Sequence, residues 1–169
     1  MLPAAVVVRP ARLNDVSKLS AFLTEAWKEA GPGALGFTGA TDEAIREIAS
    51  EEFLRKRLAS PTVHMVVAEE GERIIGFSSI RRVEERAAEL SGIMVLESAT
   101  GRGIGTRLLR KSLEAARKRG FRTVSVKTEV VNDRAIGFYK KAGFTESGKT
   151  AEKVGRTKVA LRILLKELR

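Results

Sequence analysis

Hydrophobic positions recur along the chain with two periods, and the two periods alternate from segment to segment. Segments of alternating or continuous β-branched and apolar residues predict strands, and apolar residues three and four apart predict helices. The predicted strands are Ala5–Arg9, Val63–Glu69, Arg73–Arg82, Ala88–Val95, Thr123–Thr128, Phe144–Lys149 and Lys158–Lys166. Helices are predicted to start near Asp15 and Thr41 and to cover Gly103–Arg119 and Arg134–Ala142. This order predicts a mixed α/β domain.

The chain shows no division into separate units. It has no internal repeat, no low-complexity tract and no linker, so residues 1–169 are expected to form one domain. A glycine-rich segment, residues 31–40, lies between the first two predicted helices and is expected to be a loop. In an acceptor-binding protein it is a plausible wall of the acceptor site, although a simple connector would look the same.

Composition excludes several kinds of site. Of 169 residues, 43% are hydrophobic and 31% are charged, which is ordinary for a folded domain. The absence of cysteine excludes disulfides, thiolate metal sites and a cysteine nucleophile. A single histidine, His64, gives little basis for a zinc site or a Ser-His-Asp triad, so no metal is expected. No apolar stretch approaches the ~18–20 residues that span a bilayer, and no signal peptide is evident, so we expect a cytoplasmic protein.

The charge of the chain is strongly basic. Thirty-one Lys and Arg against 21 Asp and Glu give a net charge of +10. Such a charge suits a nucleic-acid-binding or regulatory module, but aromatic residues make up only 5% and no motif that reads DNA or RNA is present. The chain also lacks glutamine and has only two asparagines, a loss of amides that is typical of thermophilic proteins. We therefore expect a thermophilic origin, which would account for surface charge without a nucleic-acid partner.

A glycine-rich turn joins the strand Ala88–Val95 to the helix Gly103–Arg119. Its sequence is Thr100-Gly101-Arg102-Gly103-Ile104-Gly105. Glycine allows the backbone to approach a ligand, and the free N–H groups at a helix start favour an anion. The turn is neither a P-loop, since no Gly-Lys-Ser/Thr follows, nor the GxGxxG dinucleotide fingerprint. It predicts a phosphate cradle, with a tight turn that binds nothing as the alternative.

Three segments of the chain share their pattern with one family. IMVLESATGRGIGTRLL contains a strand, a Gly-x-Gly turn and a helix; NDRAIGFYKKAGF fits N-x-x-A-x-x-x-Y-x-x-x-G-F; VVVRPARLNDVSKL opens the chain. Together they resemble the GNAT superfamily of acetyl-CoA-dependent N-acyltransferases. The resemblance implies a mostly antiparallel mixed sheet of about seven strands, splayed between its fourth and fifth strands and flanked by about four helices. It also implies acetyl-CoA as the cofactor, with CoA as product.

The resemblance also implies where the cofactor binds. Backbone N–H groups from Gly101 to Thr106 would hold the pyrophosphate, and the pantetheine arm would pair with the backbone of Ile93 and Val95. Thr100 stands where the family has Gln or Arg, which implies a weaker side-chain contact. The expected cofactor-binding residues are Ile93, Met94, Val95, Thr100, Gly101, Arg102, Gly103, Ile104, Gly105, Thr106, Asn132, Ala135 and Phe138.

Acylation of an amine by a thioester needs a proton acceptor, a donor to the oxyanion and a proton for the leaving thiolate. Tyr139, the only tyrosine, occupies the family position of the general acid, with a core tyrosine as the alternative. Glu89 lies fourteen residues before Gly103 and matches the catalytic glutamate of the histone-acetyltransferase branch. A surface glutamate, with a water chain as the base, is the alternative. Asn132 could bind pantetheine or cap the following helix.

Three further features concern the surroundings of the site. Leu90 and Ile93 are both core types but lie three residues apart, a spacing that a bulge at Gly92 would absorb. Free backbone N–H groups at such a bulge could hold the oxyanion. We expect His64 to be a satisfied edge residue rather than a catalyst, and Trp27 to belong to the core.

These observations favour an N-acetyltransferase that transfers an acetyl group from acetyl-CoA to a primary amine by direct attack in a ternary complex. The acceptor can be a small molecule, a protein N-terminus or a lysine. A basic nucleic-acid-binding module and a CoA-binding regulatory domain without catalysis are the alternatives of another class. A homodimer could form through the apolar strand Val159–Leu165; no membrane partner is expected, and the sequence does not favour nucleic acid.

Overall fold

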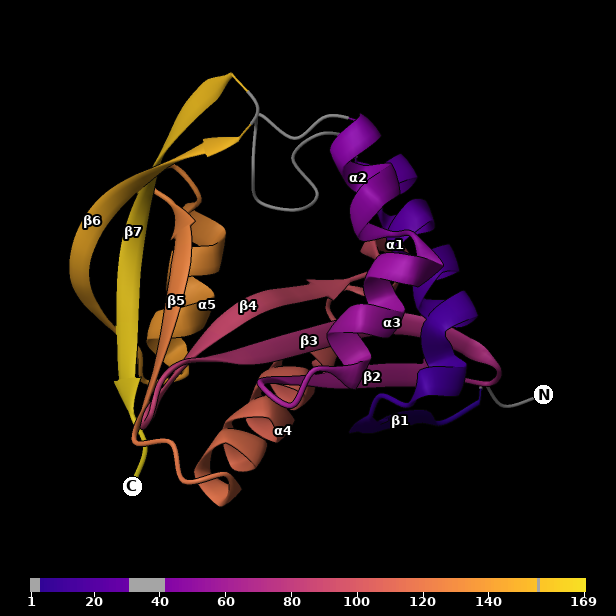
Figure 1. Ribbon diagram of the computed structural model, residues 1–169, viewed down its shortest axis with the longest axis horizontal. Coiled ribbons are helices and arrows are strands. Elements are labelled where there is room, and N and C mark those ends of the chain that lie inside the picture. Colours follow the sequence, from indigo (N-terminus) through magenta and orange to yellow (C-terminus); the bar gives the residue numbers. More distant parts are fainter. Residues whose placement is uncertain (1–3, 31–41, 155) are drawn as a thin grey trace.

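The computed structural model describes residues 4–30, 42–154 and 156–169. In this part of the chain seven strands form one sheet in the order β1-β2-β3-β4-β5-β7-β6 (Figure 1). The strands are β1 (Val6–Pro10), β2 (Val63–Glu70), β3 (Arg73–Glu84), β4 (Ala87–Val95), β5 (Thr123–Glu129), β6 (Thr145–Val154) and β7 (Thr157–Glu167). Neighbours are antiparallel except β4 and β5, which are parallel. The expected mixed, mostly antiparallel sheet is confirmed.

Five α-helices flank the sheet within the described residues: α1 (Val16–Ala30), α2 (Asp42–Ile48), α3 (Glu51–Ala59), α4 (Ile104–Lys118) and α5 (Asp133–Lys141). Two single-turn 3-10 helices are also present: η1 (Leu13–Asp15) precedes α1, and η3 (Glu97–Ala99) precedes the glycine turn. In Figure 1 the first three helices lie on one side of β1–β4, and α4 lies on the other side. The helix α5 lies beside β5.

The single helical region predicted to start near Thr41 is two helices. Ser50 separates them, because its hydroxyl accepts a hydrogen bond from the backbone N–H of Phe53 at 3.3 Å and donates to the carbonyl of Glu47 at 2.7 Å. A serine that caps a helix start in this way ends one helix and begins the next. The break accounts for five helices where about four were expected. The glycine-rich loop predicted over residues 31–40 lies outside the described residues.

The apolar core consists of two clusters that meet at β4. One joins α1, α3, β2 and β3 to the first turns of α4, and the other joins β5, α5 and β7 to the later turns of α4. Ile93 packs against both clusters. The helix α4 lies close to the sheet at Gly76, where an added Cβ would be 3.0 Å from Leu108 and 3.1 Å from the carbonyl oxygen of Met94. This close approach fixes the position of the glycine turn at the start of α4.

The two halves of the sheet separate along β4 and β5. Their pairing extends only from Ala87 to Glu89 on β4, so from Leu90 onward the β4 edge that faces away from β3 has no strand partner in the described part of the chain. The predicted bulge is present: β3 residues Ser79 and Ile80 face Gly92 and Leu90, and Ser91 is the extra residue. A bulge bends its strand and increases the local twist, which separates β4 from β5.

Candidate active site

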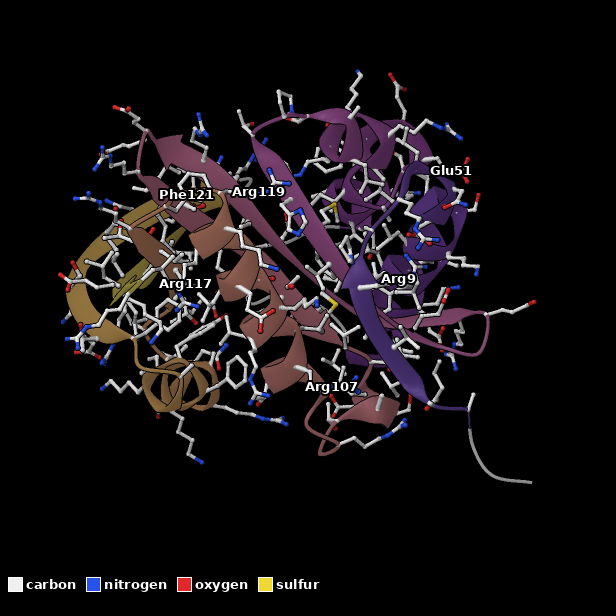
Figure 2. The ribbon with its side chains drawn as sticks, turned by 90° about the horizontal axis from the view of Figure 1, so that it is seen from below. Arg9, Glu51, Arg107, Arg117, Arg119 and Phe121 are labelled. Carbon is white, nitrogen blue, oxygen red and sulfur yellow. The ribbon has the colours of Figure 1, made fainter. Side chains whose placement is uncertain are left out.

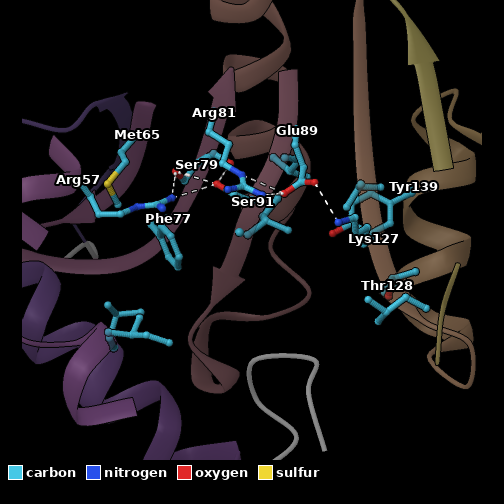
Figure 3. Close-up of a pocket in the computed structure, with 18 of the residues that line it drawn as sticks. Arg57, Met65, Phe77, Ser79, Arg81, Glu89, Ser91, Lys127, Thr128 and Tyr139 are labelled. Carbon is cyan, nitrogen blue, oxygen red and sulfur yellow. Dashed lines mark hydrogen bonds and ion pairs between the residues drawn. The ribbon is translucent and has the colours of Figure 1, made fainter. Parts of the chain in front are cut away.

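A cleft of about 490 Å³ opens where β4 and β5 separate (Figure 3). Its walls come from the helices α1, α2 and α3, from the strands β2 to β7 and from α5. The lining includes apolar side chains from both core clusters together with three cations and three carboxylates: Arg57, Arg81, Lys127, Glu89, Glu129 and Glu152. Because the cleft lies at the free edge of β4, an extended molecule bound there would contact the backbone of that strand.

Charged side chains form a chain of contacts across the cleft. Arg81 donates to Glu89 at 2.9 Å, and Lys127 lies 3.7 Å from the other oxygen of the same carboxylate. Lys127 also donates to Glu152 at 2.7 Å, and this hydrogen bond is the main cause of a raised pKa of Lys127. Glu89 therefore lies between two cations, with 14% of its side chain exposed. It is positioned in the cleft as an ion-paired carboxylate.

Tyr139 lies on α5 and reaches the cleft from the side of β5. Its ring is 6% exposed and packs edgewise against Phe138 and Phe144, with ring centroids at 5.3 and 5.7 Å. Burial raises the pKa of Tyr139 to about 12, so the phenol is protonated at neutral pH. The hydroxyl makes no hydrogen bond to any other residue that the structure describes. A neutral phenol with a free hydroxyl in a cleft can donate a proton or a hydrogen bond to a ligand.

Asn132 caps α5. Its side-chain oxygen accepts a hydrogen bond from the backbone N–H of Ala135 at 3.1 Å, and both residues line the cleft. The helix-cap interpretation of Asn132 therefore holds, and the geometry leaves its side-chain NH₂ group for a ligand. The cap and the ligand contact are compatible because they use different atoms.

The glycine turn presents free backbone donors at the start of α4. The first intrahelical bond of α4 runs from the N–H of Arg107 to the carbonyl of Gly103, and within the described residues no N–H from Gly101 to Thr106 donates to another group. Gly101 and Gly103 have φ values of 79° and 75°, and an added Cβ at either would meet nothing within 4 Å. Open space beside several free N–H groups and the positive end of a helix fits an anion such as a pyrophosphate.

The side chains of the turn have other partners. The hydroxyl of Thr100 donates to the carbonyl of Glu97 at 2.8 Å, and Arg102 forms an ion pair with Glu70. Arg107 donates to the carbonyl of Val6 at 3.0 Å and so joins α4 to β1 (Figure 2). The anion site is therefore one of backbone N–H groups rather than of side chains.

The remaining expected cofactor residues connect the turn to the cleft. Ile93, Met94 and Val95 pair with β3 on one side, and on the other side they have no strand partner among the described residues. This free edge leads from the cleft toward the turn. An added Cβ at Gly105 would lie 3.7 Å from Phe138 and 3.9 Å from Val95, so the start of α4 adjoins α5 and the end of β4. A free strand edge that ends at an anion cradle fits a long ligand with amide groups and a terminal phosphate.

His64 and Trp27 lie elsewhere. His64 borders a separate cavity of about 150 Å³ and accepts from Arg119 at 3.0 Å, and burial is the main cause of its lowered pKa. Trp27 is only partly buried and joins α1 to α2 by donating to Asp42 at 2.9 Å. Trp27 is therefore not the core residue that its spacing predicts.

Comparison with known proteins decides the family. The model of the Acetyltransferase (GNAT) family matches residues 23–144, which is more than half of the chain and includes the free edge of β4, the glycine turn and Tyr139. The chain belongs to the GNAT acetyltransferase family. The expected family is thereby confirmed.

Relatives in this family differ in what their names say they act on. Aminoglycoside N(6')-acetyltransferase type 1 of Klebsiella aerogenes is 30% identical, over 86% of this chain and 93% of the relative. The N-alpha-acetyltransferase RimI of Mycobacterium tuberculosis is 38% identical over 55% of this chain. The chain spans less than two thirds of the length of the first curated relatives that it matches, and it spans 59% of the length of RimI. The PaiA N-acetyltransferase of Thermoplasma acidophilum, solved in complex with coenzyme A, has the same fold, with a TM-score of 0.71, 20% identity and coverage of 96% and 99% of the two chains.

Sequence reasoning about this GNAT domain missed all three cations of the cleft, which are Arg57, Arg81 and Lys127. For Arg57 a signal was present. It lies four residues after Phe53 and next to Leu58, and therefore falls within the apolar side of its helix. The roles of Tyr139 and Glu89 and the set of cofactor-binding residues stay predictions. In the described residues no helix has the length and apolar character needed to cross a membrane.

Proposed function

We propose that this protein transfers the acetyl group of acetyl-CoA to a primary amine by direct attack in a ternary complex. One observation carries the proposal: a buried neutral phenol, Tyr139, and an ion-paired carboxylate, Glu89, line the same cleft at the free edge of β4. The free N–H groups of the glycine turn lie at the end of that edge. Acyl transfer to an amine needs a proton acceptor and a proton donor near one carbonyl, and this cleft provides both.

In the proposed reaction Glu89 accepts a proton from the amine, directly or through a water, as the nitrogen forms a bond to the acetyl carbon. Backbone N–H groups of the free β4 edge stabilise charge on the carbonyl oxygen. Tyr139 donates its proton to the sulfur as the carbon–sulfur bond breaks, and it regains a proton from solvent. The products are an N-acetyl amide and CoA, and the acetyl group is supplied by the bound acetyl-CoA.

The acceptor of this proposed reaction is not a polycation. The cleft is lined by three cations and three carboxylates, so it has no excess of negative charge. A polyamine or an aminoglycoside carries several positive charges and binds best where carboxylates outnumber cations. The balance favours an acceptor with few charges, such as an amino acid or the N-terminus of a peptide.

A calorimetric titration tests the cofactor site. Acetyl-CoA is compared with dephospho-CoA and with adenosine diphosphate, and we expect tight binding that requires the pantetheine arm. Release of CoA is then followed with a thiol reagent while a panel of primary amines is added. Failure of acetyl-CoA to bind at any salt concentration, with salt-sensitive binding to random duplex DNA, would instead support a nucleic-acid-binding module. Binding of acetyl-CoA without turnover of any amine would support a regulatory domain.

A further inference from the structure

Arg57 is the one arginine of α3 that points into the cleft (Figure 3). Its guanidinium lies 3.2 Å from the hydroxyl of Ser91 and 3.4 Å from the hydroxyl of Ser79, and its carbon centre is 5.9 Å from the ring of Phe53. Ser91 is the extra residue of the bulge in β4. The cation is therefore held beside the point where β4 separates from β5.

Arg57 has no counter-ion. Across residues 4–30, 42–154 and 156–169, no carboxylate forms an ion pair with its guanidinium, and the remaining residues of the chain include no Asp or Glu. The other two cations of the cleft differ, because Glu89 pairs with both Arg81 and Lys127. Burial and then the positive charge of Arg81 lower the pKa of Arg57, but an arginine stays charged at neutral pH.

A half-buried guanidinium without a carboxylate is incompletely compensated. Two neutral hydroxyls accept from it, whereas bidentate pairing with a carboxylate gives stronger, charge-assisted bonds. Both serines accept from the same terminal nitrogen, and the other N–H groups of this cleft-lining guanidinium have no acceptor among the described residues. An anionic group that enters the cleft would supply the missing partner.

We propose that the acceptor carries a carboxylate in the same molecule as its amine, and that Arg57 binds this carboxylate. Ser91 and Glu89 are two residues apart on β4, so even a fully extended chain separates them by at most about 7 Å. A carboxylate on Arg57 therefore places an amine a few bonds away on the side of Glu89. The acceptor class is a compact amino carboxylate, and this inference rests on the proposed transfer of an acetyl group to an amine.

The test compares pairs of acceptors that share one amine and differ only in a carboxylate or a carboxamide, such as glycine with glycinamide and β-alanine with β-alaninamide. The ratio of kcat/KM for the two members is measured for the unaltered protein, Arg57→Gln, Arg57→Lys and Arg55→Gln. Arg55 is the matched control, since it lies on the same helix, is exposed and pairs with Glu51. Dividing the acid-to-amide ratio of each variant by the same ratio of the unaltered protein removes the difference in basicity between the two amines.

We expect Arg57→Gln to reduce preference for the acid by about tenfold to a hundredfold, the value of one charge-assisted hydrogen bond. The effect should appear in KM, Arg57→Lys should recover part of it, and Arg55→Gln should leave it unchanged. A purely structural arginine would lower the rates for acid and amide equally. Equal ratios in the unaltered protein and in Arg57→Gln would therefore overturn the proposal.

A binding measurement separates this inference from the proposed function. N-acetylglycine and its amide are titrated calorimetrically into the complex with CoA, which requires no turnover. Preference for the acid that is lost in Arg57→Gln supports the anion site even if no amine is acetylated. Equal or absent binding of both compounds rejects the site, while acetylation of other amines in the same preparation would leave the proposed function intact.

Discussion

Replacing Tyr139 with phenylalanine tests the proposed proton donor with little change to the fold. The ring packs edgewise on Phe138 and Phe144, and phenylalanine preserves those contacts. Only the hydroxyl is lost, and among the described residues it has no hydrogen-bond partner. We therefore expect the free energy of unfolding at pH 7 to change by less than about 1 kcal/mol.

The catalytic effect should be much larger than the effect on stability. A positioned general acid contributes about 10²–10⁴-fold to a rate, so Tyr139→Phe should lower kcat by about 100-fold or more. Its dissociation constant for acetyl-CoA should remain unchanged, because the free N–H groups of the glycine turn are intact. CoA release at saturating acetyl-CoA gives kcat, and calorimetry gives the dissociation constant. An unchanged kcat would refute the role of Tyr139 as the acid.

The same variant shows whether the hydroxyl is buried in solution. Burial raises the pKa of Tyr139 from 10.0 to about 12. Above pH 10 the unfolded chain loses this proton while the native chain retains it, so native stability falls as the pH rises toward 12. At pH 11 the loss is about 1.4 kcal/mol, and the Tyr139→Phe variant lacks it. Urea unfolding of both proteins at pH 8 and pH 11 measures the difference, and equal changes in both would contradict the burial.

Three further substitutions, two of them with a matched control variant, test other parts of the structure. Gly103→Ala and Gly120→Ala both place alanine at a positive φ in open space and should cost about 1–2 kcal/mol of stability each, but only Gly103→Ala should weaken acetyl-CoA binding in a calorimetric titration. Glu89→Gln should slow transfer most at low pH, where the amine is hardest to deprotonate. Glu152→Gln is the control, because this carboxylate also pairs with Lys127 but should not slow transfer in this way. If the loss of rate in Glu89→Gln is the same at every pH, Glu89 is not the base. Asp15, buried and paired twice with an arginine of β1, has a lowered pKa, so its stabilising effect is present above about pH 4 and is lost as the pH falls. Asp15→Asn should therefore destabilise by about 3 kcal/mol at pH 7 and by about 1 kcal/mol less at pH 3 in urea unfolding, and an equal cost at both pH values would contradict the ion pair.

Local pattern predicted the elements because each strand and helix is specified by its own period. The bulge in β4 could also be predicted, since Leu90 and Ile93 cannot both face the core of a regular strand unless one residue bulges out, whereas the separation of the sheet was implied by the family resemblance. The structure assigns that extra position to Ser91 rather than Gly92. A period shows that one residue is extra, but the backbone hydrogen bonds to the neighbouring strand decide which one it is.

The charged contacts of the cleft could not be predicted, because they depend on the order of strands in space. Lys127 meets Glu152 only because β7, which pairs with β5, is also the partner of β6. Arg57 meets Ser91 across 34 positions of sequence, through the packing of α3 on the sheet. An arginine within the apolar side of a helix indicates a charged group that faces inward, but the sequence does not say what it faces.

The distribution of charge explains why one unpaired arginine can decide what the protein acetylates. The basic excess lies largely between Arg102 and Arg122, where eight cations stand against one acid, and Figure 2 shows Arg107, Arg117 and Arg119 along this segment. Three of these cations have structural partners, which are the carboxylate of Glu70, the carbonyl of Val6 and the ring of His64. The cleft itself is balanced, and exposed charges farther away than about 10 Å are screened at ordinary salt. An acceptor inside the cleft therefore responds to the nearest uncompensated charge, which is the guanidinium of Arg57, rather than to the net charge of the chain.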